Sequence, residues 1–187
     1  MAFQDSLQRH NDLFARLGGL EEIATTLADQ IEKCFASGGK LLFFGNGGSA
    51  ADSQHLAAEF VVRYKMERGP LAAMALTVDT SILTAQSNDY DFASVYARQV
   101  QAFCREEDVV IGISTSGNSD NIIEGIRAAQ AIGASAWAWT GEDGGRLNGL
   151  AKQIIRVPCT ETARIQEAHL FIGHWLCEEI DRRIAGA

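Results

Sequence analysis

The sequence has little positive charge for its length. Its 187 residues include 16 Lys and Arg against 24 Asp and Glu, which gives a net charge of −8. Proteins that bind duplex nucleic acid usually present a basic surface, so this composition disfavours that class of function. We therefore expect no nucleic-acid partner.

Cysteine is scarce, and no CxxC pair occurs. The four residues are Cys34, Cys104, Cys159 and Cys177. Such wide spacing favours reduced thiols over a disulfide framework, and it predicts a reducing compartment. No run approaches the roughly 20 apolar residues of a membrane span, and the N-terminus has no apolar signal core. We expect a soluble, cytoplasmic protein with no membrane partner.

The amounts of apolar and charged residues are those of a globular protein. Hydrophobic residues make up 47% of the chain and charged residues 21%. The length fits one domain, and neither a linker nor a solenoid repeat is visible. We expect a single domain over residues 1–187. Its first 37 residues, 1–37, form a helical extension that the domain does not need, and this extension is expected to form oligomer contacts.

The most informative stretch is residues 41–60, LLFFGNGGSAADSQHLAAEF. An apolar run predicts a strand, residues 45–49 predict a glycine-rich turn, and a helical pattern follows. In open α/β sheets the ligand crevice lies at the carboxyl ends of strands, beside helix N-termini. His55 and Glu59 are four residues apart, so they share one face of this helix. The pair alone is weak evidence for a metal site, because Glu59 could simply be solvated.

Apolar runs and helical patterns alternate along the whole chain. Besides the helix after the glycine turn, helices are expected at residues 3–17, 20–36, 79–85, 92–104, 120–132, 146–151 and 161–184. Strands are expected at residues 41–44, 72–78, 108–113, 134–140 and 154–157. Asp79 is a candidate N-cap, residues 87–91 are expected to form a polar loop, and residues 72–78 are expected to be a buried strand. This alternation predicts an α/β fold with a five-stranded parallel sheet flanked by helices, similar to Rossmann folds.

Residues 114–119, STSGNS, follow a strand and open a helix. Their hydroxyl groups are hydrogen-bond donors, and Gly117 lets the backbone approach a ligand closely. The helix N-terminus adds free N–H groups and a partial positive charge, which together suit a phosphate monoester. The loop matches neither the GxxxxGK[ST] nor the GxGxxG pattern. The alternative is an ordinary serine-rich turn that caps a helix.

Three polar side chains mark the expected last helix: Gln166, His169 and His174. A histidine in so apolar a stretch is more often a core residue than a ligand. Gln166 and His174 are eight residues apart, which is about 12 Å along a straight helix and about 80° around it. One ion contacts both only if the two side chains stretch toward each other, so the spacing alone does not select this pair.

Four motifs occur in order: GNGGSAADSQHLAAEF, SNDYDFASVYARQV, GISTSGNS and TARIQEAHLFIGHWLCEEI. Together they resemble the sugar isomerase (SIS) fold and, more closely, the phosphoheptose isomerase family, over nearly the whole chain. The resemblance implies an aldose–ketose isomerase that converts sedoheptulose 7-phosphate into D-glycero-D-manno-heptose 7-phosphate by a metal-assisted enediol mechanism. That reaction is the first step of ADP-heptose and lipopolysaccharide core synthesis. The resemblance also implies one zinc ion per subunit and a homotetramer with active sites at subunit interfaces.

The resemblance further implies the residues of the site. The implied metal ligands are His55, Glu59, Gln166 and His174. Glu59 is expected to be the catalytic base, and His174 the catalytic acid. The implied substrate contacts are Asn46, Gly47, Gly48, Glu59, Asn88, Asp89, Ser114, Thr115, Ser116, Ser119 and Gln166. Some members of the family carry an aspartate before the arginine of the RIQE motif, where this chain has Ala163.

Two other functions are compatible with the same fold. The replication-initiator-associating proteins are related SIS-fold proteins that act through protein contacts, and they lack the second histidine of the last helix. A sugar-phosphate sensor would keep the phosphate loop without catalysis. This chain has both Glu59 and His174, which favours the enzyme over either alternative.

Overall fold

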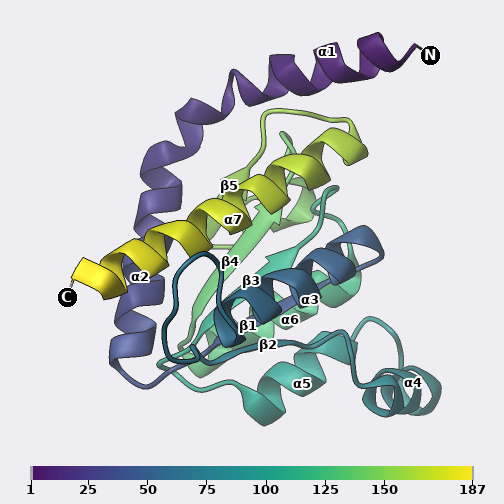
Figure 1. Ribbon diagram of the computed structural model, residues 1–187. Helices are drawn as coiled ribbons and strands as arrows, with labels where there is room; N and C mark the ends of the chain where they lie inside the picture. The colour runs from purple at the N-terminus through teal and green to yellow at the C-terminus, as the bar shows by residue number, and fades with distance from the viewer. Residues whose placement is uncertain (1, 187) are drawn as a thin grey trace.

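A parallel sheet lies at the centre of the computed structural model, which describes residues 2–186, and helices cover both faces of the sheet (Figure 1). The strands are β1 (Leu41–Gly45), β2 (Ala73–Ala75), β3 (Val109–Ile113), β4 (Ser135–Thr140) and β5 (Gln153–Arg156). Their order is β2-β1-β3-β4-β5, and all neighbours are parallel. The predicted fold class is confirmed, while the two ends of the predicted domain, residues 1 and 187, lie outside the described residues.

The helices form two layers, an N-terminal arm, and one helix, α4 (Thr80–Asp89), that lies beyond the sheet edge (Figure 1). They are α1 (Phe3–Phe14), α2 (Glu21–Ala36), α3 (Gly48–Val61), α4 (Thr80–Asp89), α5 (Val95–Phe103), α6 (Asp120–Ile132) and α7 (Thr162–Gly186). Helices α2, α3 and α7 pack on one face of the sheet, and α5 and α6 pack on the other (Figure 1). Within residues 2–186, no helix has the length and apolar character needed to cross a membrane.

Strand β1 shows why the sheet requires cover on both faces. Phe43 packs in the apolar cluster with α2, α3 and α7, whereas Leu42 and Phe44 pack with α5 and α6. All three side chains are buried. Alternate side chains of a strand point to opposite faces, so an unbroken apolar run places apolar side chains on both. The continuous pattern LLFF therefore indicates a central strand.

The sheet has a topological switch point between β1 and β3. The chain leaves β1 through α3 toward the edge strand β2, and it leaves β3 through α6 toward β4, in the opposite direction. In open α/β sheets, ligands bind outside the carboxyl ends of the strands at such a point. β1 and β3 pair along their length, up to Gly45 opposite Ile113. The glycine turn after β1 and the serine loop after β3 therefore begin side by side.

Three local predictions were wrong in part. The helix expected at residues 146–151 is only a short 3₁₀ helix, Gly145–Leu147. The strand expected at residues 72–78 is only three residues long, lies at the sheet edge, and has Met74 41% exposed, so it is not a fully buried strand. The N-cap prediction is confirmed, since the Asp79 carboxylate accepts a hydrogen bond from the amide of Ile82 at 2.9 Å. However, α4 continues to Asp89, so most of the expected polar loop is helical. The Ser87 hydroxyl donates to the carbonyl of Leu83, which lets this polar residue stay inside the helix.

Candidate active site

Helices α3 and α7 run side by side in the same direction. A Cβ placed on Gly48 would lie 2.7 Å from Nε2 of Gln166, and a Cβ placed on Gly173 would lie 2.4 Å from Cδ2 of Leu56. The first contact joins the N-terminal parts of the two helices, and the second joins their middles. Because α-helices share one rise per residue, this parallel register brings the middle of α3 level with the middle of α7.

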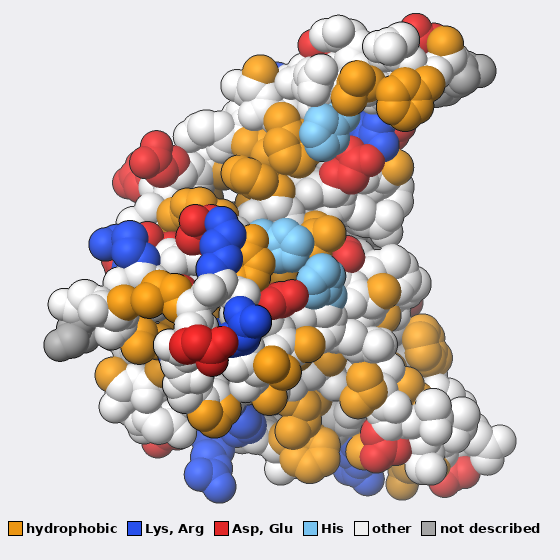
Figure 2. Space-filling model, viewed as in Figure 1, with side chains coloured by type: hydrophobic (Ala, Val, Ile, Leu, Met, Phe, Trp, Pro, Cys, Tyr) orange, Lys and Arg blue, Asp and Glu red, His pale blue; other side chains and the backbone are white. Residues whose placement is uncertain are grey.

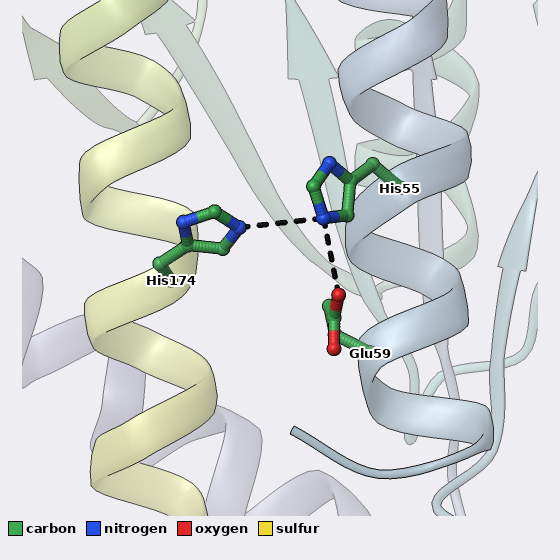
Figure 3. A group of neighbouring side chains, drawn as sticks. All are labelled: His55, Glu59 and His174. Atoms are coloured by element: carbon green, nitrogen blue, oxygen red, sulfur yellow. Dashed lines mark hydrogen bonds and ion pairs between the residues drawn. The ribbon is translucent and has the colours of Figure 1, made fainter. Parts of the chain in front are cut away.

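Three polar side chains meet where the two helices are level: His55 and Glu59 from α3, and His174 from α7 (Figure 3). Nε2 of His55 lies 3.0 Å from Oε1 of Glu59 and 3.4 Å from Nε2 of His174. Their candidate ligand atoms all lie within 4.8 Å of one another. In the space-filling view, two histidine side chains are exposed next to each other on this face (Figure 2). One chain therefore brings together three of the four predicted metal ligands.

The donor atoms of this cluster suit a transition metal such as zinc. Two imidazole nitrogens and one carboxylate are a common zinc ligand set. The facing Nε2 atoms of His55 and His174 can share at most one proton between them, whereas a metal ion accepts both lone pairs. Burial and the neighbouring His55 hold the pKa of His174 below its usual value, against the opposing charge of Glu59. This shift favours the neutral ring that metal binding requires.

Asp52 lies near His55 of the cluster, and the sequence analysis did not single it out. It lies one turn before His55 on α3, on the same face as His55 and Glu59. Its Oδ2 atom is buried and has no hydrogen-bond partner among the described residues. Burial raises the pKa of this carboxyl group, and the nearby His55 acts in the opposite direction. The signal in the sequence was its spacing of three and seven residues from His55 and Glu59.

Gln166 lies against Gly48, at the first turn of α3. It is eight residues before His174, so it is about 12 Å from that residue along α7. Its amide is therefore placed near the N-terminus of α3, between the histidine cluster and the carboxyl ends of the strands. Its role as a metal ligand stays a prediction.

The serine loop and the glycine turn are joined at the switch point. The Ser114 and Ser119 hydroxyl groups lie 3.1 Å apart, and the hydroxyl of Ser116 accepts a hydrogen bond from the amide of Asn118. The side-chain amides of Asn46 and Asn121 exchange two hydrogen bonds, of 2.9 and 2.8 Å. These bonds tie the turn after β1 to the first turn of α6.

Gly117 fixes the shape of the serine loop. Its φ is +64°, and a Cβ at this position would lie 2.0 Å from the carbonyl oxygen of Gly144. Only glycine fits so close an approach in the left-handed region. The amide of Leu147 donates to the carbonyl of Gly117, and the amide of Gly141 donates to the carbonyl of Thr115. The connection between β4 and β5 therefore holds the serine loop in place through backbone hydrogen bonds.

Asn88 and Asp89 are not brought to the histidine cluster. They form the exposed C-terminal end of α4 and hydrogen-bond to each other at 2.9 Å. In Figure 1, α4 lies beyond the sheet edge, apart from α7. Their role in substrate binding stays a prediction.

His169 is the core histidine that the apolar pattern of α7 suggested. It is fully buried, and its Nε2–H group donates to the carbonyl of Thr140 at 3.2 Å. Burial lowers its pKa to about 4, so the ring is neutral. The same helix thus carries a structural histidine and, five residues later, a site histidine.

Comparison with known proteins identifies the family. The SIS domain family matches residues 19–141. A phosphoheptose isomerase of Aquifex aeolicus is 52% identical over 87% of this chain and 81% of that protein. The solved structure of phosphoheptose isomerase from Neisseria gonorrhoeae superposes with a TM-score of 0.85 at 42% identity, covering 96% of this chain and 99% of that one. The structure of a phosphoheptose isomerase from Francisella tularensis gives a TM-score of 0.92 at 33% identity, covering 97% and 100% of the two chains.

These matches define a SIS-domain protein, and its structure carries a histidine–carboxylate cluster between α3 and α7. The chain belongs to the phosphoheptose isomerase family and, as a member, is a sugar-phosphate isomerase. The resemblance drawn from the four motifs is confirmed at this level.

Proposed function

We propose that this enzyme converts sedoheptulose 7-phosphate into D-glycero-D-manno-heptose 7-phosphate through an enediol. The reaction moves a proton between C1 and C2, which requires a base near both carbons and proton exchange at their two oxygens. As the first step toward ADP-heptose, it would supply lipopolysaccharide core synthesis. The relatives' printed name, phosphoheptose isomerase, supports this substrate class.

The separation between the cluster and the loops is the observation that carries the proposal. His55 lies seven residues from Gly48, the first residue of α3, or about 10 Å along the helix. The N-terminus of α3 and the serine loop meet at the switch point, where a phosphate would bind. The span between the two matches the length of an extended seven-carbon sugar phosphate, so one open-chain substrate reaches both.

Glu59 is assigned the proton transfer between the carbons. Its Oε1 atom faces His55, whereas no described residue donates a hydrogen bond to its Oε2 atom. One carboxylate oxygen is therefore available to serve as a ligand while the other acts as the base. His174 is assigned the proton transfers at the substrate oxygens, from the opposite side of the cluster.

Zinc, one ion per chain, is the proposed cofactor, held by His55, Glu59 and His174, with Gln166 as a fourth ligand. When bound, it would supply Lewis-acid polarisation of the substrate carbonyl. The donor set of the cluster supports this assignment. Asp52 adds negative charge near His55.

The two loops are assigned to the phosphate and the sugar chain. Ser114, Thr115, Ser116 and Ser119 would hold the phosphate with their hydroxyl groups and with the amides at the start of α6. Asn46, Gly47 and Gly48 would contact the sugar beside Gln166. Fixing the phosphate orients the reacting end of a flexible chain at the cluster, which accelerates the reaction by lowering its entropic barrier.

We also propose a cytoplasmic homotetramer whose N-terminal extension, residues 1–37, forms subunit contacts. Phe3 and Leu7 on α1 are 78% and 41% exposed, and Phe14, Leu17 and Trp175 line an apolar groove of about 280 Å³ beside α7. In such an assembly, Asn88 and Asp89 would reach the active site of a neighbouring subunit. The free state of all four cysteines supports a reducing compartment.

An assay of sedoheptulose 7-phosphate isomerisation tests the proposal. Purified wild-type protein is compared with Glu59→Gln and His174→Ala, and the product is followed by phosphorus NMR in deuterated buffer. The proposal expects turnover by the wild type and its loss in both variants. Wild-type turnover in either variant would contradict the proton transfers assigned to that residue, and no turnover with added zinc would contradict the substrate assignment.

A further inference from the structure

A buried ion pair links the end of α3 to α7 behind the histidine cluster. Nε of Arg68 lies 2.7 Å from Oδ1 of Asp181, and the two side chains are only 6% and 2% exposed. Oδ2 of Asp181 also accepts the backbone amides of Lys65 and Met66, each at 3.2 Å. Burial alone would raise the pKa of Asp181, but the bonds from Arg68 and the two amides outweigh it, and the pKa is lowered. The Asp181 carboxylate is therefore ionised, and both of its oxygens accept hydrogen bonds.

The rest of the Arg68 guanidinium caps the C-terminus of α3. It donates to the carbonyl of Glu59 at 2.9 Å and to the carbonyl of Phe60 at 2.8 Å. The last carbonyls of a helix have no partner within the helix, and they carry the negative end of its dipole. A buried cation at this point supplies both the missing hydrogen bonds and the complementary charge. One of the two capped carbonyls belongs to Glu59 itself.

Through Asp181, the ion pair links the C-terminal end of α3 to the helix that carries His174. Asp181 follows His174 by seven residues, two turns of α7, so both side chains project from one face of that helix. Between them lies Cys177, which is buried. The pKa of its thiol is raised first by burial and then by the charges of Glu59 and Asp181. The cluster and the ion pair are therefore neighbours on the same helix–helix contact.

We propose that Arg68 and Asp181 are positioning residues that hold Glu59 and His55 at the correct distance from His174. The ion pair anchors the backbone of Glu59 to α7, while the close packing of Gly173 on Leu56 fixes the helices one turn earlier. Without the anchor, the last turn of α3 is free to shift relative to α7. The cluster then keeps its residues but loses its spacing. This inference rests on the proposed site at His55, Glu59 and His174.

Asp181→Asn is the test variant, and Asp108→Asn is its matched control. Asp108 is equally buried at 1%, pairs with Lys40 at 2.6 Å, and accepts the amides of Lys40 and Arg105. It thus makes the same kinds of bond as Asp181, but it lies just before β3, at the opposite end of that strand from the serine loop. Any effect of losing a buried carboxylate as such appears in both variants.

The first readout is the nitrogen NMR spectrum of the four imidazole rings in metal-free protein. Asp181→Asn is expected to shift the signals of His55 and His174 and to leave those of His10 and His169 in place. Asp108→Asn is expected to leave the signals of His55 and His174 unchanged. Unshifted His55 and His174 signals in folded Asp181→Asn protein would overturn the proposal. This readout needs neither metal nor substrate, so it decides the positioning role even if the proposed function fails.

The second readout is zinc affinity by chelator competition, together with the visible spectrum of the cobalt-substituted protein. Losing a residue that orients metal ligands typically weakens binding by about 10- to 100-fold, and we expect this for Asp181→Asn but not for Asp108→Asn. If Asp181→Asn does not fold, Arg68→Lys replaces it, because a lysine keeps the charge but cannot bond Asp181 and both carbonyls together. Wild-type affinity and an unchanged cobalt spectrum in the folded variant would overturn the proposal. A wild-type protein that binds no zinc would instead contradict the proposed metal centre.

Discussion

Gly173 of α7 packs directly on Leu56 of α3, and a Cβ at position 173 would lie 2.4 Å from Cδ2 and 2.6 Å from Cδ1 of that leucine. Leu56 is 1% exposed, so it has no room to move away. This contact lies one residue from His174 and one residue from His55. Because Gly173 has no side chain, the two helices can approach each other this closely at the active site.

Gly173→Ala is expected to push the two helices apart. Overpacking of a buried contact typically costs about 1–3 kcal/mol, and we expect a loss of unfolding free energy in this range with weaker zinc binding. Urea denaturation and chelator competition measure the two effects. The double variant Gly173→Ala with Leu56→Ala restores the space and should recover part of the zinc affinity. Wild-type zinc affinity in Gly173→Ala would contradict the role of this contact.

Gly117→Ala is expected to damage the phosphate loop more than loss of a hydroxyl does. A Cβ there would meet the carbonyl oxygen of Gly144 at 2.0 Å, and the backbone has a φ of +64°. The loop must therefore move, and we expect KM for the sugar phosphate to rise by tenfold or more. Ser119→Ala keeps the backbone and removes one hydroxyl contact, so a smaller rise in KM is expected, with kcat nearly unchanged if that contact serves binding alone. Steady-state kinetics separate these cases, and equal KM values for wild type and Gly117→Ala would contradict the assignment of the loop.

His169 is expected to make the fold less stable in mild acid. Its pKa is about 4 in the folded protein against an ordinary value of 6.5, so between these values the unfolded chain binds more protons. Stability attributable to this residue is therefore present above pH 6.5 and is lost as pH falls toward 4, by up to about 1.4 kcal/mol per pH unit. Urea denaturation of metal-free wild type and His169→Gln across this range measures the difference in slope. Parallel slopes would show that His169 is not held neutral by burial.

Glu59→Gln is expected to remove most activity while leaving the fold intact. The amide keeps the size of the side chain but cannot accept a proton, and loss of a general base typically costs about 10²- to 10⁴-fold in rate. Turnover of sedoheptulose 7-phosphate and a thermal melt of the metal-free protein measure the two properties. Glu67→Gln is a suitable control, because Glu67 is an exposed glutamate that pairs with Arg63 four residues away. A variant Glu59→Gln with wild-type turnover would exclude Glu59 as the base.

Most of the sheet could be predicted from the sequence because its strands are buried on both faces. A strand such as β3, with all five residues buried, is an unbroken apolar run that periodicity detects. The edge strand β2 was predicted too long because pairing with one neighbour, rather than apolar content, sets its three-residue length. Helix α4 was predicted too short because its last turn is polar. The Ser87 hydroxyl donates a hydrogen bond to the carbonyl of Leu83 inside the helix, and composition does not reveal this bond.

The site residues also differ in how far the sequence alone could predict them. The pair His55 and Glu59 was visible because one helix presents both residues on one face. His174 could be added only through family resemblance, since the parallel register of α3 and α7 is a tertiary feature. Asp52 was missed although its spacing was informative, because a buried carboxylate oxygen without a hydrogen-bond partner is seen only in the structure.

Zinc titration of chelated protein, with sedoheptulose 7-phosphate turnover measured at each point, tests the central claim most directly. The account predicts negligible turnover in the metal-free protein, a linear rise with added zinc, and saturation at one zinc per chain. His174→Ala should bind zinc more weakly and show no recovery. Full turnover by the metal-free wild-type protein would contradict the metal-assisted isomerisation assigned to His55, Glu59 and His174.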